Sequence, residues 1–90
     1  MQAQQKKLLK ELAKHIKEYR GNKSISMLSN EINLSKSIWS ELEKGNKDIQ
    51  FSTFWRIAEA LDIKPSLLVA EIEDKLGKNF SFIEDSLIQQ

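Results

Sequence analysis

Apolar residues recur at helical spacing in five segments of the chain, and the breaks between these segments hold residues that end helices. The first predicted helix spans residues 5–20, and its apolar face consists of Leu8, Leu12, Ile16 and Tyr19. Gly21 and Asn22 interrupt the pattern, which indicates a tight turn. No segment alternates with a period of two for long enough to indicate a strand, so the pattern predicts an all-α fold.

The next two predicted helices are short. The second spans residues 24–32, with Ser24 placed to cap its amino-terminal end. The third spans residues 35–44 and is followed by Gly45, which can take the left-handed conformation that ends a helix. Short helices joined by so short a turn must cross steeply, so we predict a helix-turn-helix at about residues 24–44.

Two further helices complete the predicted bundle. In the fourth, Ser52 is the expected N-cap, and the buried stripe consists of Phe54, Ile57, Ala58 and Leu61. Trp55 lies next to this stripe, so we expect it in the core. The fifth begins at Pro65, because proline is favoured at the first position of a helix, and ends at Gly77. Residues 1–77 therefore form one predicted five-helix domain.

Residues 78–90 follow this domain as a short C-terminal extension. Ser81 and Glu84 have the spacing of a capping box, which favours a short helix, whereas the alternation of Phe80 and Phe82 is typical of a strand. The extension is too apolar to be a free tail, and its apolar residues are Phe80, Phe82, Ile83, Leu87 and Ile88. It either caps the core or packs against a second copy of the chain as a dimerisation segment.

The third predicted helix has two chemically different sides. Ile38, Trp39 and Leu42 form an apolar side, which we expect to be buried. The opposite side is rich in small hydrogen-bonding groups and consists of Lys36, Ser37, Ser40, Glu41 and Lys44. Such a side can be an ordinary solvated surface, but its donors and its carboxylate also suit the edges of DNA bases.

Composition and charge narrow the class of protein. The 90 residues suit one small domain, and the absence of cysteine excludes disulfide bonds and thiolate metal sites. The net charge is +1, but it is unevenly distributed. Residues 1–47 hold ten Lys/Arg and five Asp/Glu, whereas residues 48–90 hold four Lys/Arg and eight Asp/Glu. The two balances, +5 and −4, sum to +1. A chain polarised in this way can present a basic face to phosphates, although charged stretches are also common on solvated surfaces.

Several functions lack a sequence signal. There is no apolar run long enough to span a membrane and no apolar core of a signal peptide, so we expect a cytoplasmic protein. The single histidine, His15, has no second ligand or catalytic partner nearby, and we place it on the helix surface. Without a nucleophile–base pair, a metal-ligand cluster or a glycine loop for phosphates, the sequence predicts no enzyme and no cofactor.

Two segments resemble a known family. Residues 34–45 read Leu-Ser-Lys-Ser-Ile-Trp-Ser-Glu-Leu-Glu-Lys-Gly, and residues 52–63 read Ser-Thr-Phe-Trp-Arg-Ile-Ala-Glu-Ala-Leu-Asp-Ile. The first resembles the recognition helix of lambda-repressor/Cro-type helix-turn-helix domains, the XRE family, and the second resembles their fourth helix. Leu28 and Ser29 are similar to the family's Leu-Ala pair in helix 2. The resemblance extends from about residue 16 to residue 68.

This resemblance implies a lambda-repressor-like five-helix bundle that binds double-stranded DNA. Residues 24–32 would lie across the DNA backbone, and residues 36–43 would enter the major groove. The positions that face base edges are then Lys36, Ser37, Ser40 and Glu41. The resemblance also implies that Arg20 and Glu43 form a structural bridge between the first and third helices.

The chain departs from the family at the start of the second helix. The family usually has Gln there, where it contacts phosphate, and this chain has Ile25. The turn before this helix is also about two residues shorter than is usual. Other groups must therefore hold the DNA backbone, and we expect these to be Lys23, Ser24, Ser35, Lys44, Asn46 and Lys47.

The sequence thus predicts a transcriptional regulator, which we interpret as a repressor, that binds a specific double-stranded DNA sequence. One domain of this size reads few base pairs, so we expect a homodimer. An alternative with the same chemistry is the antitoxin of a toxin–antitoxin pair, whose acidic C-terminal half would bind a toxin protein. A helical protein-interaction module without DNA binding is the alternative from another class.

Overall fold

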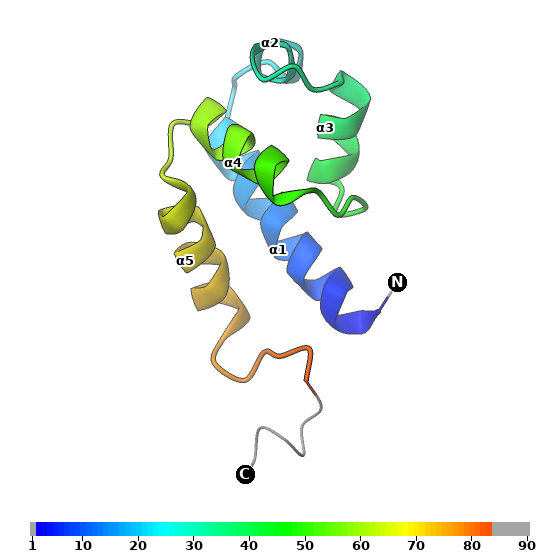
Figure 1. The fold of residues 1–90 in the computed structure, drawn as a ribbon, viewed down its shortest axis with the longest axis vertical. Helices are drawn as coiled ribbons and strands as arrows, with labels where there is room; N and C mark the ends of the chain where they lie inside the picture. Colours follow the sequence, from blue (N-terminus) through cyan, green and yellow to red (C-terminus); the bar gives the residue numbers. More distant parts are fainter. Residues whose placement is uncertain (1, 84–90) are drawn as a thin grey trace.

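The computed structural model describes residues 2–83 and leaves residue 1 and residues 84–90 undescribed (Figure 1). Its five helices are α1 (Ala3–Arg20), α2 (Ile25–Glu31), α3 (Lys36–Glu43), α4 (Phe51–Ala60) and α5 (Pro65–Leu76). The described part of the chain has no strand, which confirms the predicted all-α bundle. α1 begins at Ala3, two residues earlier than predicted. None of the helices within residues 2–83 is long and apolar enough to cross a membrane.

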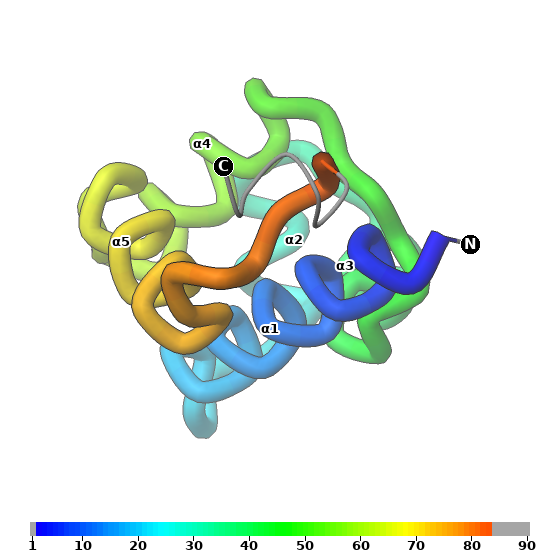
Figure 2. The backbone as a smooth tube through the Cα atoms, turned by 90° about the horizontal axis from the view of Figure 1, so that it is seen from below, coloured from blue at the N-terminus to red at the C-terminus, as the bar shows by residue number. Residues whose placement is uncertain are grey.

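α1 runs through the middle of the bundle and packs against both α3 and α5. α3 and α5 lie on opposite sides of it, as Figure 1 shows from one direction and Figure 2 from another. The largest fully buried side chains come from four helices and are Ile16, Trp39, Leu42, Ile57 and Leu68. Each such burial contributes roughly 1.5–3 kcal/mol, so the core joins all four helices into one unit.

Three of the helices end in the same way. Asn33 after α2, Gly45 after α3 and Asp62 after α4 have φ angles of 56°, 78° and 61°. In each case the N–H groups of this residue and the next donate to carbonyls of the last helical turn, which is the Schellman arrangement. These ends make both turns that flank α3 short and well defined.

Gly45 is buried against α1. A Cβ atom there would lie 3.5 Å from the Cα of Lys10 and 3.7 Å from the carbonyl oxygen of Leu9. These are ordinary contact distances, so it is the left-handed conformation, with φ of 78°, that disfavours a side chain. The carboxyl end of α3 therefore rests directly on the backbone of α1.

The start of α4 differs from the prediction. Gln50, in extended conformation, is the N-cap, and Ser52 lies inside the first turn and does not cap the helix. The predicted stripe is buried as expected, but Trp55 is half-exposed, so its predicted place in the core is wrong. Trp55 follows Phe54 by one residue and is therefore rotated by about 100° from the centre of the buried stripe.

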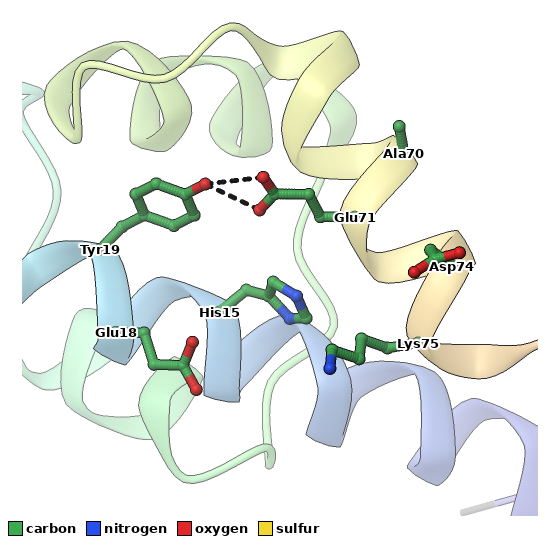
Figure 3. Close-up of a pocket in the computed structure, with 7 residues that line it drawn as sticks. All are labelled: His15, Glu18, Tyr19, Ala70, Glu71, Asp74 and Lys75. Carbon is green, nitrogen blue, oxygen red and sulfur yellow. Dashed lines mark hydrogen bonds between the residues drawn. The ribbon is translucent and has the colours of Figure 1, made fainter.

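His15 was expected on the helix surface, and this expectation is also wrong, because the side chain is buried. α5 packs along this side of α1, and in Figure 3 the ring points toward α5, with the Lys75 side chain extending toward it. Its Nδ1 lies 2.8 Å from the carbonyl oxygen of Glu11, so this nitrogen donates a hydrogen bond. The residue is thus part of the contact between α1 and α5.

The described part of the C-terminal extension contacts the first turns of α1. Gln4 donates from Nε2 to the carbonyl oxygen of Ser81 at 2.6 Å, and the Nζ of Lys7 lies 5.9 Å from the ring centre of Phe80. Ser81 Oγ accepts from the N–H of Ile83 at 2.9 Å, so the hydroxyl takes part in a local turn. Residues 79–83 form no strand. The remainder of the extension, where Leu87 and Ile88 would belong to the alternative short helix, lies outside the described residues.

Three side chains join the end of α3 to the end of α1. Arg20 donates from Nε to Oε2 of Glu43 at 2.6 Å and from Nη2 to Oε1 at 2.9 Å. Trp39 donates from its indole Nε1 to Oε2 of Glu43 at 2.7 Å. The side chain of Glu43 is 7% exposed and that of Arg20 is 18% exposed. The bridge predicted between the first and third helices is therefore present, and the core tryptophan of α3 takes part in it.

This network holds Glu43 in its ionised form. Burial by itself would raise the pKa of the Glu43 carboxyl. The hydrogen bonds from Arg20 and Trp39, together with the charges of Arg20 and Lys17, outweigh burial and lower this pKa below its ordinary value of 4.5. Hydrogen bonding to Glu43 in turn raises the pKa of Arg20.

Replacing Arg20 by methionine should destabilise the fold strongly, because it leaves a buried carboxylate without a cation. We expect a loss of about 3 kcal/mol in the free energy of unfolding, measured by urea titration with tryptophan fluorescence. Lys14→Met is the matched control, since the Lys14 side chain is 66% exposed and lies 3.7 Å from Glu11, and ion pairs with a solvent-exposed partner contribute less than about 1 kcal/mol. Equal losses in the two variants would contradict the role assigned to the bridge.

Acid should weaken the same network. Because the folded-state pKa of Glu43 lies below its unfolded-state value, its contribution is complete above about pH 4.5 and is lost as pH falls through the folded-state pKa. The urea midpoint should therefore decline on acidification below this pH. Glu43→Gln cannot ionise and should decline less steeply. Parallel curves for the two proteins would assign the acid sensitivity to other carboxyl groups.

Candidate nucleic-acid interface

The turn between α2 and α3 is fixed by its own hydrogen bonds. Asn33 and Leu34 donate their N–H groups to the carbonyls of Asn30 at 3.2 Å and Ser29 at 2.8 Å, which closes α2. Ser35 Oγ then accepts from the N–H of Ile38 at 3.1 Å, which begins α3. Ser24 caps α2 in the same way, accepting from the N–H of Met27 at 3.2 Å. Both helices of the unit thus have the serine caps that the sequence predicts.

Burial determines which side of α3 faces outward. Trp39 and Leu42 are fully buried, and Ile38 is partly buried. Of the four predicted base-contacting residues, Lys36, Ser37 and Glu41 are exposed and Ser40 is partly buried. These four residues therefore share the outward side of a helix whose other side is held in the core.

The predicted backbone-contacting residues flank this side of α3. Lys23 and Ser24 precede α2, and Ser35 precedes the first residue of α3 as its N-cap. The residues that follow α3 are Lys44, Asn46 and Lys47. All six side chains are exposed. The hydroxyl oxygens of Ser24 and Ser35 accept the capping bonds. Each hydroxyl still has its hydrogen, which can be donated to a phosphate oxygen.

The carboxylate of Glu41 is held toward the loop that follows α3. Asn46 Nδ2 lies 3.5 Å from Glu41 Oε2, and the N–H of Asn46 donates to the Glu41 carbonyl at 3.2 Å. Lys36 and Lys44 share the outward side of α3 with Glu41. Among the described residues, the ion pairs are Lys14–Glu11 and Arg20–Glu43, so neither lysine is paired with Glu41.

Arg56, which the sequence did not single out, holds the helix-turn-helix to α4. It donates from Nη1 to the carbonyl oxygen of Ile32 at 2.7 Å and from Nη2 to Thr53 Oγ1 at 3.3 Å. Ile32 is the C-cap residue of α2, so this arginine satisfies a carbonyl at the end of that helix. No local pattern predicts this contact, because its partners lie 24 residues apart in the chain.

Ser29 occupies the position where the family has alanine. Its side chain is buried, and its Oγ donates to the carbonyl oxygen of Ile25 at 2.7 Å. The carbonyl oxygen of Ser26 is a second, more distant acceptor at 3.3 Å. The hydroxyl therefore finds a partner within α2 and replaces alanine without an unsatisfied donor.

Acidic groups gather on the far side of α1 from α3. Glu71 and Asp74 of α5 line a hollow together with Glu18 and Tyr19 of α1 (Figure 3). The hydroxyl of Tyr19 lies 2.7 and 2.9 Å from the two oxygens of Glu71, and this hydrogen bond raises the pKa of Tyr19 above its ordinary value. The carboxylates of α5 are thus kept away from the side of the bundle that carries Lys36. Within residues 2–83 no group of three or more His, Cys, Asp or Glu could hold a metal ion.

Comparison with known proteins agrees with this geometry. Residues 16–68, which are 53 of the 90 residues, match a family model described as helix-turn-helix, of the XRE or lambda-repressor type. Comparisons with curated proteins and with solved structures gave no match. The matched segment contains α2, α3 and the turn between them, as well as Arg20 and Glu43. The chain therefore belongs to the XRE or lambda-repressor type of helix-turn-helix family, whose members are DNA-binding regulators.

Proposed function

We propose that this protein is a transcriptional repressor that binds a specific double-stranded DNA sequence as a homodimer, with α3 in the major groove. The observation that carries the proposal is the division of α3. Trp39 and Leu42 hold one side in the core, while Lys36, Ser37 and Glu41 are offered to solvent on the other. A helix presented in this way has the width and the side chains that the major groove admits.

The chemistry of the outward side suits base edges. Lys36, at the first position of α3, can donate to O6 and N7 of guanine, and Ser37 can donate or accept. Glu41 can accept from N4 of cytosine, and its hydrogen bond with Asn46 limits the directions that the carboxylate can take. Ser40 is small and partly buried, which lets the helix approach the groove closely.

Phosphate contacts come from both ends of the unit. Lys23 and the hydroxyl of Ser24 lie before α2, and Lys44 and Lys47 follow α3. These groups take the place of the family's glutamine at position 25, where isoleucine is partly buried and packs against the core. Contacts of this kind position the protein on DNA, whereas the α3 side chains supply the sequence preference.

Lys36→Ala and Lys47→Ala should separate base reading from phosphate binding. Lys36→Ala should lose about 1–3 kcal/mol of preference at one base pair of a duplex selected by the protein. Lys47→Ala should weaken binding to every duplex and lower the slope of log affinity against log salt by about one. Fluorescence anisotropy with selected and random duplexes, titrated over salt, measures both effects.

Lys75→Ala is the matched control, because Lys75 is an exposed lysine in the last turn of α5, on the other side of α1 from α3. Lys75→Ala should leave both the base-pair preference and the slope of log affinity against log salt unchanged. Wild-type affinity in both Lys36→Ala and Lys47→Ala would show that the DNA face is assigned wrongly. A wild-type protein that bound no duplex at low salt would instead be an interaction module. DNA binding together with co-purification of a second protein would favour the antitoxin.

A further inference from the structure

One apolar face of the bundle is left uncovered by the five helices. On it Phe51, the first residue of α4, is 72% exposed, and Trp55, one turn later, is 47% exposed. Val69 of α5 is 47% exposed. Large apolar side chains gathered in one exposed area mark an interaction surface in a small folded domain.

A groove of about 270 Å³ lies beside Phe51 on this face. Its walls come from α1, α4, α5 and the segment before α4, and they include Leu8, Ile49, Phe51 and Val69. The charged group in the lining is Asp48, whose Oδ2 already accepts a hydrogen bond from Gln5 Nε2 at 2.8 Å. The groove therefore offers mainly apolar contact, with this hydrogen-bonded carboxylate as the charged group in its lining.

The ring of Phe51 is supported by its neighbours. It stacks on Phe54, with ring centres 6.2 Å apart and planes 10° apart, and meets the edge of Trp55 at 6.0 Å. It is therefore an aromatic projection held in position next to a groove. When a projection and a groove share one face, two identical copies related by a two-fold axis can each insert the projection into the other's groove.

We propose that this face, made of Phe51, Trp55, Val69 and the adjoining groove, is the homodimer interface, with a second copy of this chain as its occupant. The inference rests on the proposed function, since two half-sites on DNA require two copies. An apolar face is complementary to itself, because apolar contact is not directional and needs no opposite charge on the partner. The groove is also smaller than the roughly 300 Å³ at which small-molecule sites begin.

The size and place of the face agree with this occupant. Covering Phe51 and Trp55 alone would bury roughly 250 Å² of aromatic surface per copy. This is a large share of the apolar centre of an interface that buries roughly 800 Å² per partner. None of the residues that line the groove belongs to the proposed DNA contacts, so the dimer leaves the outward side of α3 free.

Sedimentation equilibrium of the full chain tests the interface. The wild type should dimerise, and Phe51→Glu and Val69→Lys should each be monomeric, because each places a charge in the contact. A mixture of the two variants should regain dimers, since Glu at 51 in one copy then faces Lys at 69 in the other while the second contact stays native. Leu67→Glu is the control, because Leu67 is 49% exposed on α5 but does not line the groove, and it should dimerise like the wild type.

Circular dichroism establishes that each variant is folded, and recovery in the mixture excludes misfolding as the cause of dissociation. A wild-type protein that stays monomeric at the highest soluble concentration overturns the proposed interface. If this monomer still binds an isolated half-site, the proposed DNA binding is supported. A Phe51→Glu variant that remains dimeric also overturns the proposed interface. If removal of residues 84–90 then dissociates the dimer, the C-terminal extension forms the interface instead. A native dimer that binds no DNA would support the interface and contradict the proposed function.

Discussion

The orientation of α3 depends on one buried carboxylate. α3 has eight residues, too few to be stable as an isolated helix, so its position comes from tertiary contacts. Glu43 at its end binds the guanidinium of Arg20 and the indole of Trp39, and Gly45 rests on the backbone of α1. Arg20 also donates to the carbonyl of Lys23 at 3.0 Å. One ion pair thus connects α1, the turn before α2 and α3.

The same arrangement separates the surfaces of the protein by function. Because Trp39 and Leu42 turn inward, the lysine, serine and glutamate side chains of α3 must turn outward. α5, with Glu71 and Asp74, lies beyond α1 and keeps negative charge away from them. The apolar face around Phe51 is a third surface, distinct in chemistry from both. A chain with almost no net charge can in this way carry both the proposed DNA-binding face and the proposed dimerisation face.

Helical periodicity and capping residues were sufficient to predict five helices, the serine caps of α2 and α3 and most of the core. They failed where tertiary packing decides the outcome. His15 is covered by α5, which its own helix cannot reveal, and Trp55 lies just beyond the edge of the buried stripe. The contact from Arg56 to the end of α2 has no local signal at all. The Arg20–Glu43 pair was predicted because a family resemblance, and not spacing, brought together residues 23 positions apart.

Selection of bound sequences from a random duplex library tests the central claim, that the outward side of α3 reads base pairs. The wild type should enrich a sequence with two related half-sites about 10 base pairs apart. Glu41→Gln should enrich a sequence altered at one position of each half-site, because glutamine pairs with adenine where a carboxylate accepts from cytosine. No enriched sequence, or the same sequence with both proteins, would contradict the account.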